Sequence, residues 1–289
     1  MLYRIDTTSN TTQALCVTPT RELAIQIVDK AILPMSVNIQ EPKLRVQLAI
    51  AQCDKPLSSP RGDTVPHIVV GTPGKIVDWM KRRIIVPQHI KVFVLDEADT
   101  MVESGSGHRA NSLLIQQKLS YNCQCLFFSA TFSPSVLQFS SKIMNNNNAV
   151  DKILIEDGPE YLVLDIIKQL YVDTRSYRGG KLEFLADIYS LLTIGQSIVF
   201  VGRKSDADAI YNTLQQAGYT CSLLHGAVEP TTRDTVMEAF RNGESNVLIT
   251  TNVLARGVDV RVICKLRLAS LSHLFSFSSR NIFYLSTKG

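Results

Sequence analysis

The sequence predicts an α/β fold with two domains, each a parallel β-sheet flanked by helices. Two observations carry this prediction. Short runs rich in β-branched residues alternate with stretches of helical periodicity almost throughout, which is the pattern of repeated strand–helix–strand units. The chain also has 289 residues, a length that suits two domains of ordinary size, each large enough to bury its own core.

In the first half, four apolar runs are expected to form strands, and each run ends in small polar or acidic residues. The first run leads into a helix that opens at TPTRELAIQIV, where Leu23, Ile27 and Val28 recur at helical spacing. The stretches that carry the strands are QALCV (13–17), HIVVGTPGKIVDWMKR (67–82), KVFVLDEAD (91–99) and CQCLFFSATFS (123–133).

The second half repeats this order in the stretches 197–218, 220–243 and 246–260. The first of these reads as strand, turn and helix closed by Gly218. Ligands of open parallel sheets bind beyond the carboxyl ends of the strands. We therefore expect the functional residues of both halves at those ends.

A surface connection is expected at 144–160, which contains an asparagine run and a Gly-Pro pair. We place the first domain at 1–150 and the second at 151–262. Residues 263–289 contain no acidic residue and carry serines without clear periodicity. We hypothesise that this atypical tail is foreign to the fold.

Composition narrows the class of protein. With 45% hydrophobic and 19% charged residues, the chain is expected to be soluble and globular. The net charge of +4 is a mild basic excess, compatible with a polyanionic partner but no proof of one. No apolar run reaches the roughly 18 residues that a membrane span needs, so we expect no membrane insertion. The six cysteines show no CxxC spacing, which favours reduced thiols inside a cell.

The stretch VFVLDEAD places three acids directly after an apolar strand. Asp96 at the strand end can hold Mg²⁺ through its water shell, because magnesium prefers few carboxylates together with phosphates. Glu97 is placed to orient or deprotonate an attacking water, as phosphoryl transfer requires. Asp99 could bridge to the next strand. The alternative is a solvated acidic turn.

Three further motifs of the first half have a functional and a structural interpretation each. In PTRELA, Thr20 or nearby backbone amides at a helix start can bind a phosphate oxygen, with Arg21 adding charge; alternatively, this is an ordinary helix N-terminus. In GTPGK, Gly71 and Gly74 either admit a phosphate or make a turn. The SAT motif (129–131) offers two hydroxyls that could link Asp99 to a second site; alternatively, it is a polar strand terminus.

The second half offers a similar choice. Arg256 and Asp259 form a charged pair at a predicted strand–turn junction, with a nucleotide or an interdomain salt bridge as the expected partner. For His225, a structural role is favoured over catalysis. Three residues are candidates for contacting a nucleic-acid backbone: Gly226, Thr250 and Thr251.

The order of these motifs resembles that of the DEAD-box RNA helicases. PTRELA, TPGK, DEAD, SAT, an IVFV strand and ARGxD follow one another over about residues 13–262. The resemblance implies two RecA-like domains, ATP and Mg²⁺ as cofactors, RNA-stimulated ATP hydrolysis and local RNA unwinding. The stretches 167–173, 191–201 and 248–260 resemble the subgroup that remodels messenger ribonucleoprotein in mRNA export.

The family pattern also implies residue roles. Asp96 and Glu97 would serve Mg²⁺–ATP and the hydrolytic water, Asp99 with Ser129 and Thr131 would couple hydrolysis to domain closure, and Arg256 and Asp259 would approach the nucleotide. The residues expected to grip the RNA backbone are Pro19, Thr20, Arg21, Thr72, Pro73, Gly74, Gly226, Arg233 and Thr250. The implied partners are single-stranded RNA or messenger ribonucleoprotein and nuclear-pore proteins. The resemblance also implies that the protein is a monomer. Its implied location is the cytoplasm and the nucleus, including the nuclear pore.

The sequence departs from the family pattern in two places. Family members carry a GxGKT phosphate-binding loop before PTRELA and an HRxGRxGR motif after ARGxD, and neither occurs among the 289 residues. An arginine finger alone contributes about 10³–10⁵ in rate. We therefore expect a chain that is incomplete at both ends, with a first domain missing its N-terminal part and without ATP turnover. An ATPase-inactive module that binds RNA or a partner protein is the alternative, and a helicase-like ATPase acting on DNA is a third hypothesis.

Overall fold

The chain folds into two compact units, Met1–Lys152 and Ile153–Gly289. The sequence placed this boundary two residues earlier, at 150. The computed structural model describes residues 1–37, 43–51, 65–102, 107–144, 151–153, 167–171, 180–191, 195–251, 264–268 and 282–286. Most of the connection predicted at 144–160 lies outside these residues.

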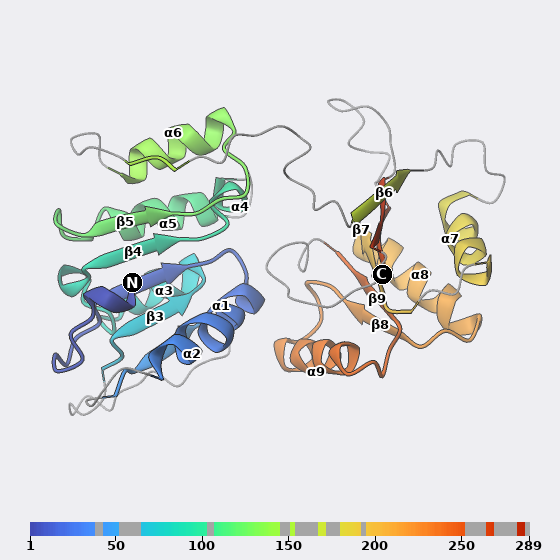
Figure 1. Ribbon diagram of the computed structural model, residues 1–289, viewed down its shortest axis with the longest axis horizontal. Coiled ribbons are helices and arrows are strands. Elements are labelled where there is room, and N and C mark those ends of the chain that lie inside the picture. Colours follow the sequence, from blue (N-terminus) through green and yellow to red (C-terminus); the bar gives the residue numbers. More distant parts are fainter. Residues whose placement is uncertain are drawn as a thin grey trace. The chain divides into compact units, whose positions relative to one another are not determined.

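The first unit is built on a five-stranded sheet in the order β2-β3-β1-β4-β5, shown with its helices in Figure 1. All four neighbouring pairs are parallel, as the sequence predicted. The strands are β1 (Ala14–Val17), β2 (Val46–Ala49), β3 (Ile68–Gly71), β4 (Val92–Leu95) and β5 (Gln124–Phe127).

Helices cover both faces of this sheet, which explains why its central strands are apolar throughout rather than alternating. Leu15 packs with Trp79 in the core on one face. Its neighbour Cys16 packs with Val28 in the core on the other face. The helical elements are η1 (Leu2–Arg4), α1 (Arg21–Ile27), the π-helix η2 (Val28–Ile32), α2 (Leu33–Ser36), α3 (Pro73–Lys81), η3 (Pro87–His89), α4 (Ala98–Val102), α5 (His108–Gln116) and α6 (Pro134–Ile143).

The second unit has a six-stranded sheet in the order β6-β11-β10-β7-β9-β8. Strands β8, β9, β7 and β10 are parallel to one another, but β11 is antiparallel to both β10 and β6. The prediction of a parallel sheet is therefore wrong for this side of the sheet. The strands are β6 (Ile167–Tyr171), β7 (Ser197–Val201), β8 (Cys221–Leu224), β9 (Val247–Thr250), β10 (Cys264–Leu268) and β11 (Ile282–Ser286).

Strands β10 and β11 belong to the stretch that we hypothesised to be foreign to the fold. The structure instead places both strands inside the second sheet. Apolar and polar residues alternate in CKLRL (264–268), a period of two that suits a strand. The remaining residues of the tail lie outside the described part of the chain.

In the described part of the second unit, three helices flank the sheet: α7 (Gly180–Leu191), α8 (Lys204–Gln216) and α9 (Pro230–Arg241). Val199 of β7 packs with residues of α7 and α8 on one face, while Ile198 packs with Phe240 of α9 on the other. Within the described ranges, no helix is long and apolar enough to cross a membrane.

Candidate nucleotide and nucleic-acid site

The carboxyl ends of four strands form one row at an edge of the first sheet. Val17 is in register with Gly71 on one side and Leu95 on the other, and Leu95 is in register with Phe127. Because the strands are parallel, the segments that follow them all leave this same edge. The structure therefore brings together the predicted site segments 19–21, 72–74, 96–99 and 129–131 within one unit.

Asp96 follows β4 and is half-buried. Its backbone N–H donates to the carbonyl oxygen of Val17 (3.0 Å), and its Oδ1 accepts the N–H of Glu97 (2.9 Å). Burial raises the pKa of Asp96, and the hydrogen bond from Glu97 only partly offsets this effect. A partly desolvated carboxylate gains stabilisation from a nearby cation, so the position suits a residue that faces Mg²⁺.

Glu97 has a φ of 50°, in the left-handed region that costs a non-glycine residue about 1 kcal/mol. The conformation turns the chain from β4 into α4. The Glu97 carbonyl oxygen accepts the N–H groups of Thr100 (3.0 Å) and Met101 (3.3 Å). Backbone strain of this kind gathers at functional sites, which agrees with a functional role for Glu97.

The bridge that we predicted from Asp99 to the next strand is present. Asp99 is 7% exposed, and its Oδ2 accepts the hydroxyl of Thr131 (2.8 Å). Ser129 Oγ accepts the N–H of Asp99 (3.2 Å) and donates to the Thr131 carbonyl oxygen (2.8 Å). These hydrogen bonds therefore tie the acidic turn to the segment after β5.

Thr20 is the N-cap of α1. Its hydroxyl accepts the N–H of Leu23 (3.2 Å), and its carbonyl oxygen accepts the hydroxyl of Thr18 (2.9 Å). The helix therefore begins at the sheet edge with its positive dipole end outward, which attracts a phosphate. An ordinary helix start uses the same capping bond, so this geometry fits both interpretations. A hydroxyl that accepts one hydrogen bond can still donate another.

The two glycines of GTPGK have different explanations. A Cβ on Gly71 would lie 2.0 Å from the carbonyl oxygen of Ala49 on β2, so the close approach of two strands requires this glycine. A Cβ on Gly74 would have Asn111 Nδ2 at 3.8 Å as its nearest contact, an ordinary van der Waals distance. Thr72 and Pro73 start α3 beside it. A role for Gly74 in admitting a phosphate stays a prediction, whereas Gly71 is explained by the fold.

In the second unit, Arg233 folds back onto the turn that contains Gly226. Its Nη2 donates to the Gly226 carbonyl oxygen (3.0 Å) and its Nε to the Val228 carbonyl oxygen (2.9 Å). The sequence assigned this guanidinium to an RNA backbone. The structure shows it holding the turn, and its RNA contact stays a prediction.

Thr250 is fully buried at the end of β9, and its hydroxyl donates to the carbonyl oxygen of Thr251 (3.0 Å). Thr251 follows the strand and is partly exposed. Of the two threonines, Thr251 is therefore the better candidate for contacting a ligand. Arg256 and Asp259 lie outside the described residues, so the charged pair expected there stays a prediction.

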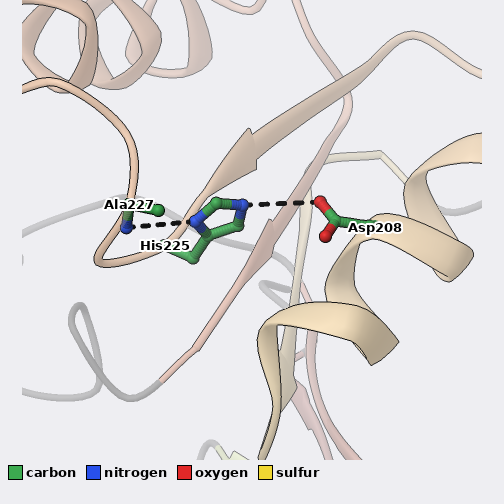
Figure 2. Close-up of polar contacts among 3 residues, drawn as sticks. All are labelled: Asp208, His225 and Ala227. Atoms are coloured by element: carbon green, nitrogen blue, oxygen red, sulfur yellow. Dashed lines mark hydrogen bonds and ion pairs between the residues drawn. The ribbon is translucent and has the colours of Figure 1, made fainter.

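His225 joins two elements of the second unit, as Figure 2 shows. Its Nε2 lies 3.4 Å from Oδ1 of Asp208 on α8, and its Nδ1 accepts the N–H of Ala227 (3.3 Å). The imidazole is 12% exposed. Both ring nitrogens have partners, in agreement with the structural role predicted for this residue.

Two family models match the chain. The model described as DEAD/DEAH box helicase covers residues 1–139, and the helicase conserved C-terminal domain covers residues 180–266. The chain belongs to the DEAD-box helicase family. The family predicted from the order of the motifs is therefore confirmed.

Known DEAD-box helicases of one kind are similar to this chain along most of its length. The ATP-dependent RNA helicase DBP5 of Meyerozyma guilliermondii is 42% identical over 260 residues, which are 90% of this chain and 51% of that protein. The chain thus spans about half the length of the curated relatives it matches. The structure of S. cerevisiae Dbp5 bound to RNA and ADP BeF3 is 35% identical, with a TM-score of 0.78, over 94% of this chain and 66% of that one. A Dbp5 variant bound to Nup159, Gle1, IP6 and ADP gives 34% identity and a TM-score of 0.53 over 87% and 62%.

The carboxylate at the end of β4 would suit magnesium better than a transition metal. Among the residues that the structure describes, no three His, Cys, Asp or Glu side chains are grouped to hold a metal ion. Asp96 instead offers a partly buried carboxylate at an open sheet edge. Mg²⁺ keeps several waters and binds through one or two carboxylates plus substrate phosphates, so the residues present fit a Mg²⁺–nucleotide complex.

Proposed function

We propose that this chain provides the RNA-binding edge and the hydrolytic carboxylates of an ATP-dependent RNA helicase that acts in mRNA export. One observation carries the proposal. The N-termini of α1 and α3, the acidic turn after β4 and the segment after β5 leave a single edge of one parallel sheet. An RNA site and a nucleotide site on this edge would be coupled, because paired strands of one sheet position both.

RNA would be held by its backbone. Residues 19–21 and 72–74 present two helix N-termini and the small Gly74, a surface suited to phosphates rather than to base edges. In the second unit, the RNA backbone would be held by Gly226, Arg233 and Thr251. Thr251 replaces Thr250 in this role, because Thr250 is buried. Contacts of this kind are blind to sequence and weaken as the salt concentration rises.

The acidic turn would serve hydrolysis. Mg²⁺–ATP supplies the phosphoryl group and the charge neutralisation for its transfer. Asp96 would hold the ion through its water shell, and Glu97 would orient the attacking water. Asp99, tied to Thr131 and Ser129, would transmit changes at this turn to the following segment.

The partners and location follow from the relatives. Dbp5 of S. cerevisiae has been solved with RNA, and a variant of it with Nup159 and Gle1. By similarity, we infer that the whole protein acts on messenger ribonucleoprotein at the nuclear pore, between nucleus and cytoplasm.

A second candidate function is RNA binding without ATP hydrolysis. No GxGKT sequence occurs among the 289 residues, and the backbone amides and lysine of that loop cradle the phosphates in P-loop enzymes. The helix starts at Arg21 and Pro73, which we propose to face RNA, do not depend on such a loop.

ATP hydrolysis by the purified chain, with and without single-stranded RNA, separates the two candidates. RNA-stimulated turnover that Glu97→Gln abolishes supports the helicase activity for the chain itself. RNA binding that ignores nucleotide, without turnover, supports the second candidate. A folded chain that neither binds RNA nor hydrolyses ATP contradicts both.

A further inference from the structure

The turn after β8 is held by one backbone hydrogen bond and by the side chain of Arg233 on α9. The carbonyl oxygen of His225 accepts the N–H of Val228 (3.0 Å), which closes a four-residue turn around Gly226 and Ala227. From α9, Arg233 donates to the carbonyl oxygens of Gly226 (3.0 Å) and Val228 (2.9 Å). Arg233 thus holds the turn through its carbonyl oxygens.

The amide side of the turn is fixed by the His225 imidazole. Nδ1 accepts the N–H of Ala227 at 3.3 Å, as drawn in Figure 2. A nitrogen that accepts a hydrogen bond carries no proton, so this contact requires the proton to sit on Nε2. Whether the proton sits on Nε2 depends on the group that Nε2 contacts.

Asp208 supplies the partner for Nε2. Its Oδ1 lies 3.4 Å from Nε2. A carboxylate oxygen attracts a ring nitrogen only when that nitrogen carries a proton, so Asp208 selects the tautomer with the proton on Nε2. The imidazole is 12% exposed, whereas the Asp208 side chain is 54% exposed. The pair therefore spans from the surface of α8 to the base of the turn.

We propose that His225 and Asp208 are positioning residues for the RNA backbone. The inference rests on the proposed function, which places an RNA phosphate against the turn at Gly226. Asp208 fixes the imidazole tautomer, the imidazole and Arg233 hold the N–H and the carbonyl oxygen of the Gly226–Ala227 peptide, and the exposed turn at Gly226 is thereby kept in one conformation. Arg233 holds the same turn from the opposite side, so its contribution to RNA affinity is also one of positioning.

The test uses the full chain and a fluorescent single-stranded RNA, with the dissociation constant measured by anisotropy. His225→Ala removes the acceptor and is expected to weaken binding about fivefold, the ratio that the loss of one hydrogen bond gives. His225→Asn restores an acceptor two residues before Ala227, as in an Asx turn, and should bind within about twofold of wild type.

Asp208→Ala tests the tautomer. Its matched control is Asp206→Ala, which removes the same charge from the same helix without touching His225. We expect Asp208→Ala to weaken binding relative to this control. The imidazole ¹⁵N shifts should show the proton on Nε2 in the wild-type chain and a mixture of tautomers in Asp208→Ala.

Any of three results would overturn the inference. One is wild-type affinity in a His225→Ala chain that melts like the wild type. Another is a wild-type imidazole with its proton on Nδ1. The third is binding by His225→Asn as weak as by His225→Ala, because the acceptor would then not matter. A wild-type chain that fails to bind RNA contradicts the proposed function itself, whereas the ¹⁵N shifts still decide the tautomer.

Discussion

Asp96 and Asp99 are separated by two residues, and each accepts the backbone N–H of the residue after it, but they differ in burial and in their other partners. Asp99 is buried, and its two oxygens accept hydrogen bonds from Thr100 and Thr131. Asp96 is half-buried at the sheet edge, and burial raises its pKa. The bridge from Asp99 to the following strand was predicted from the sequence, but the difference in burial was not, because burial depends on which carboxylate the segment after β5 covers.

Replacing Asp96 by asparagine should stabilise the fold while removing the carboxylate proposed to face Mg²⁺. Asparagine keeps the acceptor for the Glu97 N–H and removes a charge whose burial is unfavourable. We expect a gain of about 0.5–1 kcal/mol in the free energy of unfolding at pH 7, measured by urea denaturation.

The pH dependence of this gain has a definite sign. Because burial raises the folded-state pKa of Asp96 above its ordinary value of 3.8, the ionised carboxylate destabilises the fold above that folded-state pKa. The advantage of Asp96→Asn should shrink as the pH falls through it towards 3.8. A gain that is the same at pH 7 and pH 4 would contradict the assignment.

Replacing Thr131 by valine should break the bridge to Asp99. The change keeps the shape and leaves Asp99 Oδ2 without this donor, so we expect a loss of about 1 kcal/mol in unfolding free energy. Thr131→Ser keeps the hydroxyl and serves as the control. Equal stability of Thr131→Val and wild type would mean that water replaces the hydroxyl at no cost.

At the scale of elements, strands and their carboxyl ends were predictable where apolar runs stop abruptly. Strands β1, β3, β4 and β5 each start one residue after the start of the predicted stretch. Strand β2 was missed, because VQLA (46–49) interrupts its apolar residues with Gln47 and carries no motif. Only the pairing of β2 with β3 identifies it and explains Gly71.

The two glycines of GTPGK provide a matched pair for testing the packing of β2. Gly71→Ala places a methyl group against the backbone of Ala49, so β2 and β3 must separate, at an expected cost of about 3 kcal/mol. Gly74→Ala meets only Asn111 Nδ2 at 3.8 Å and should change the unfolding free energy by less than about 0.5 kcal/mol. Thermal denaturation followed by circular dichroism measures both. Similar melting temperatures for the two variants would show that β2 moves aside freely.

At the scale of the whole molecule, the sequence predicted two α/β units and the family, but neither the mixed second sheet nor the burial of Thr250. Antiparallel pairing of β11 could not be anticipated, because a strand's direction depends on its partner rather than on its own residues. Burial of Thr250 depends on the face it takes in β9, and a one-residue shift reverses that face. Order and spacing of motifs therefore predict a family more reliably than they predict which of two adjacent threonines contacts a ligand.

The central claim is that the first sheet edge binds an RNA backbone, and anisotropy titration of a labelled single-stranded RNA with the full chain tests it most directly. We predict that the logarithm of the association constant falls linearly with the logarithm of the salt concentration. Gly74→Ala should weaken binding roughly tenfold, about 1.4 kcal/mol, without loss of fold, because the added methyl group occupies space next to the phosphate. Gln88→Ala, in η3 at the amino-terminal side of β4, is the surface control and should bind like wild type. Unchanged affinity of a folded Gly74→Ala chain, or binding that does not depend on salt, would contradict the account.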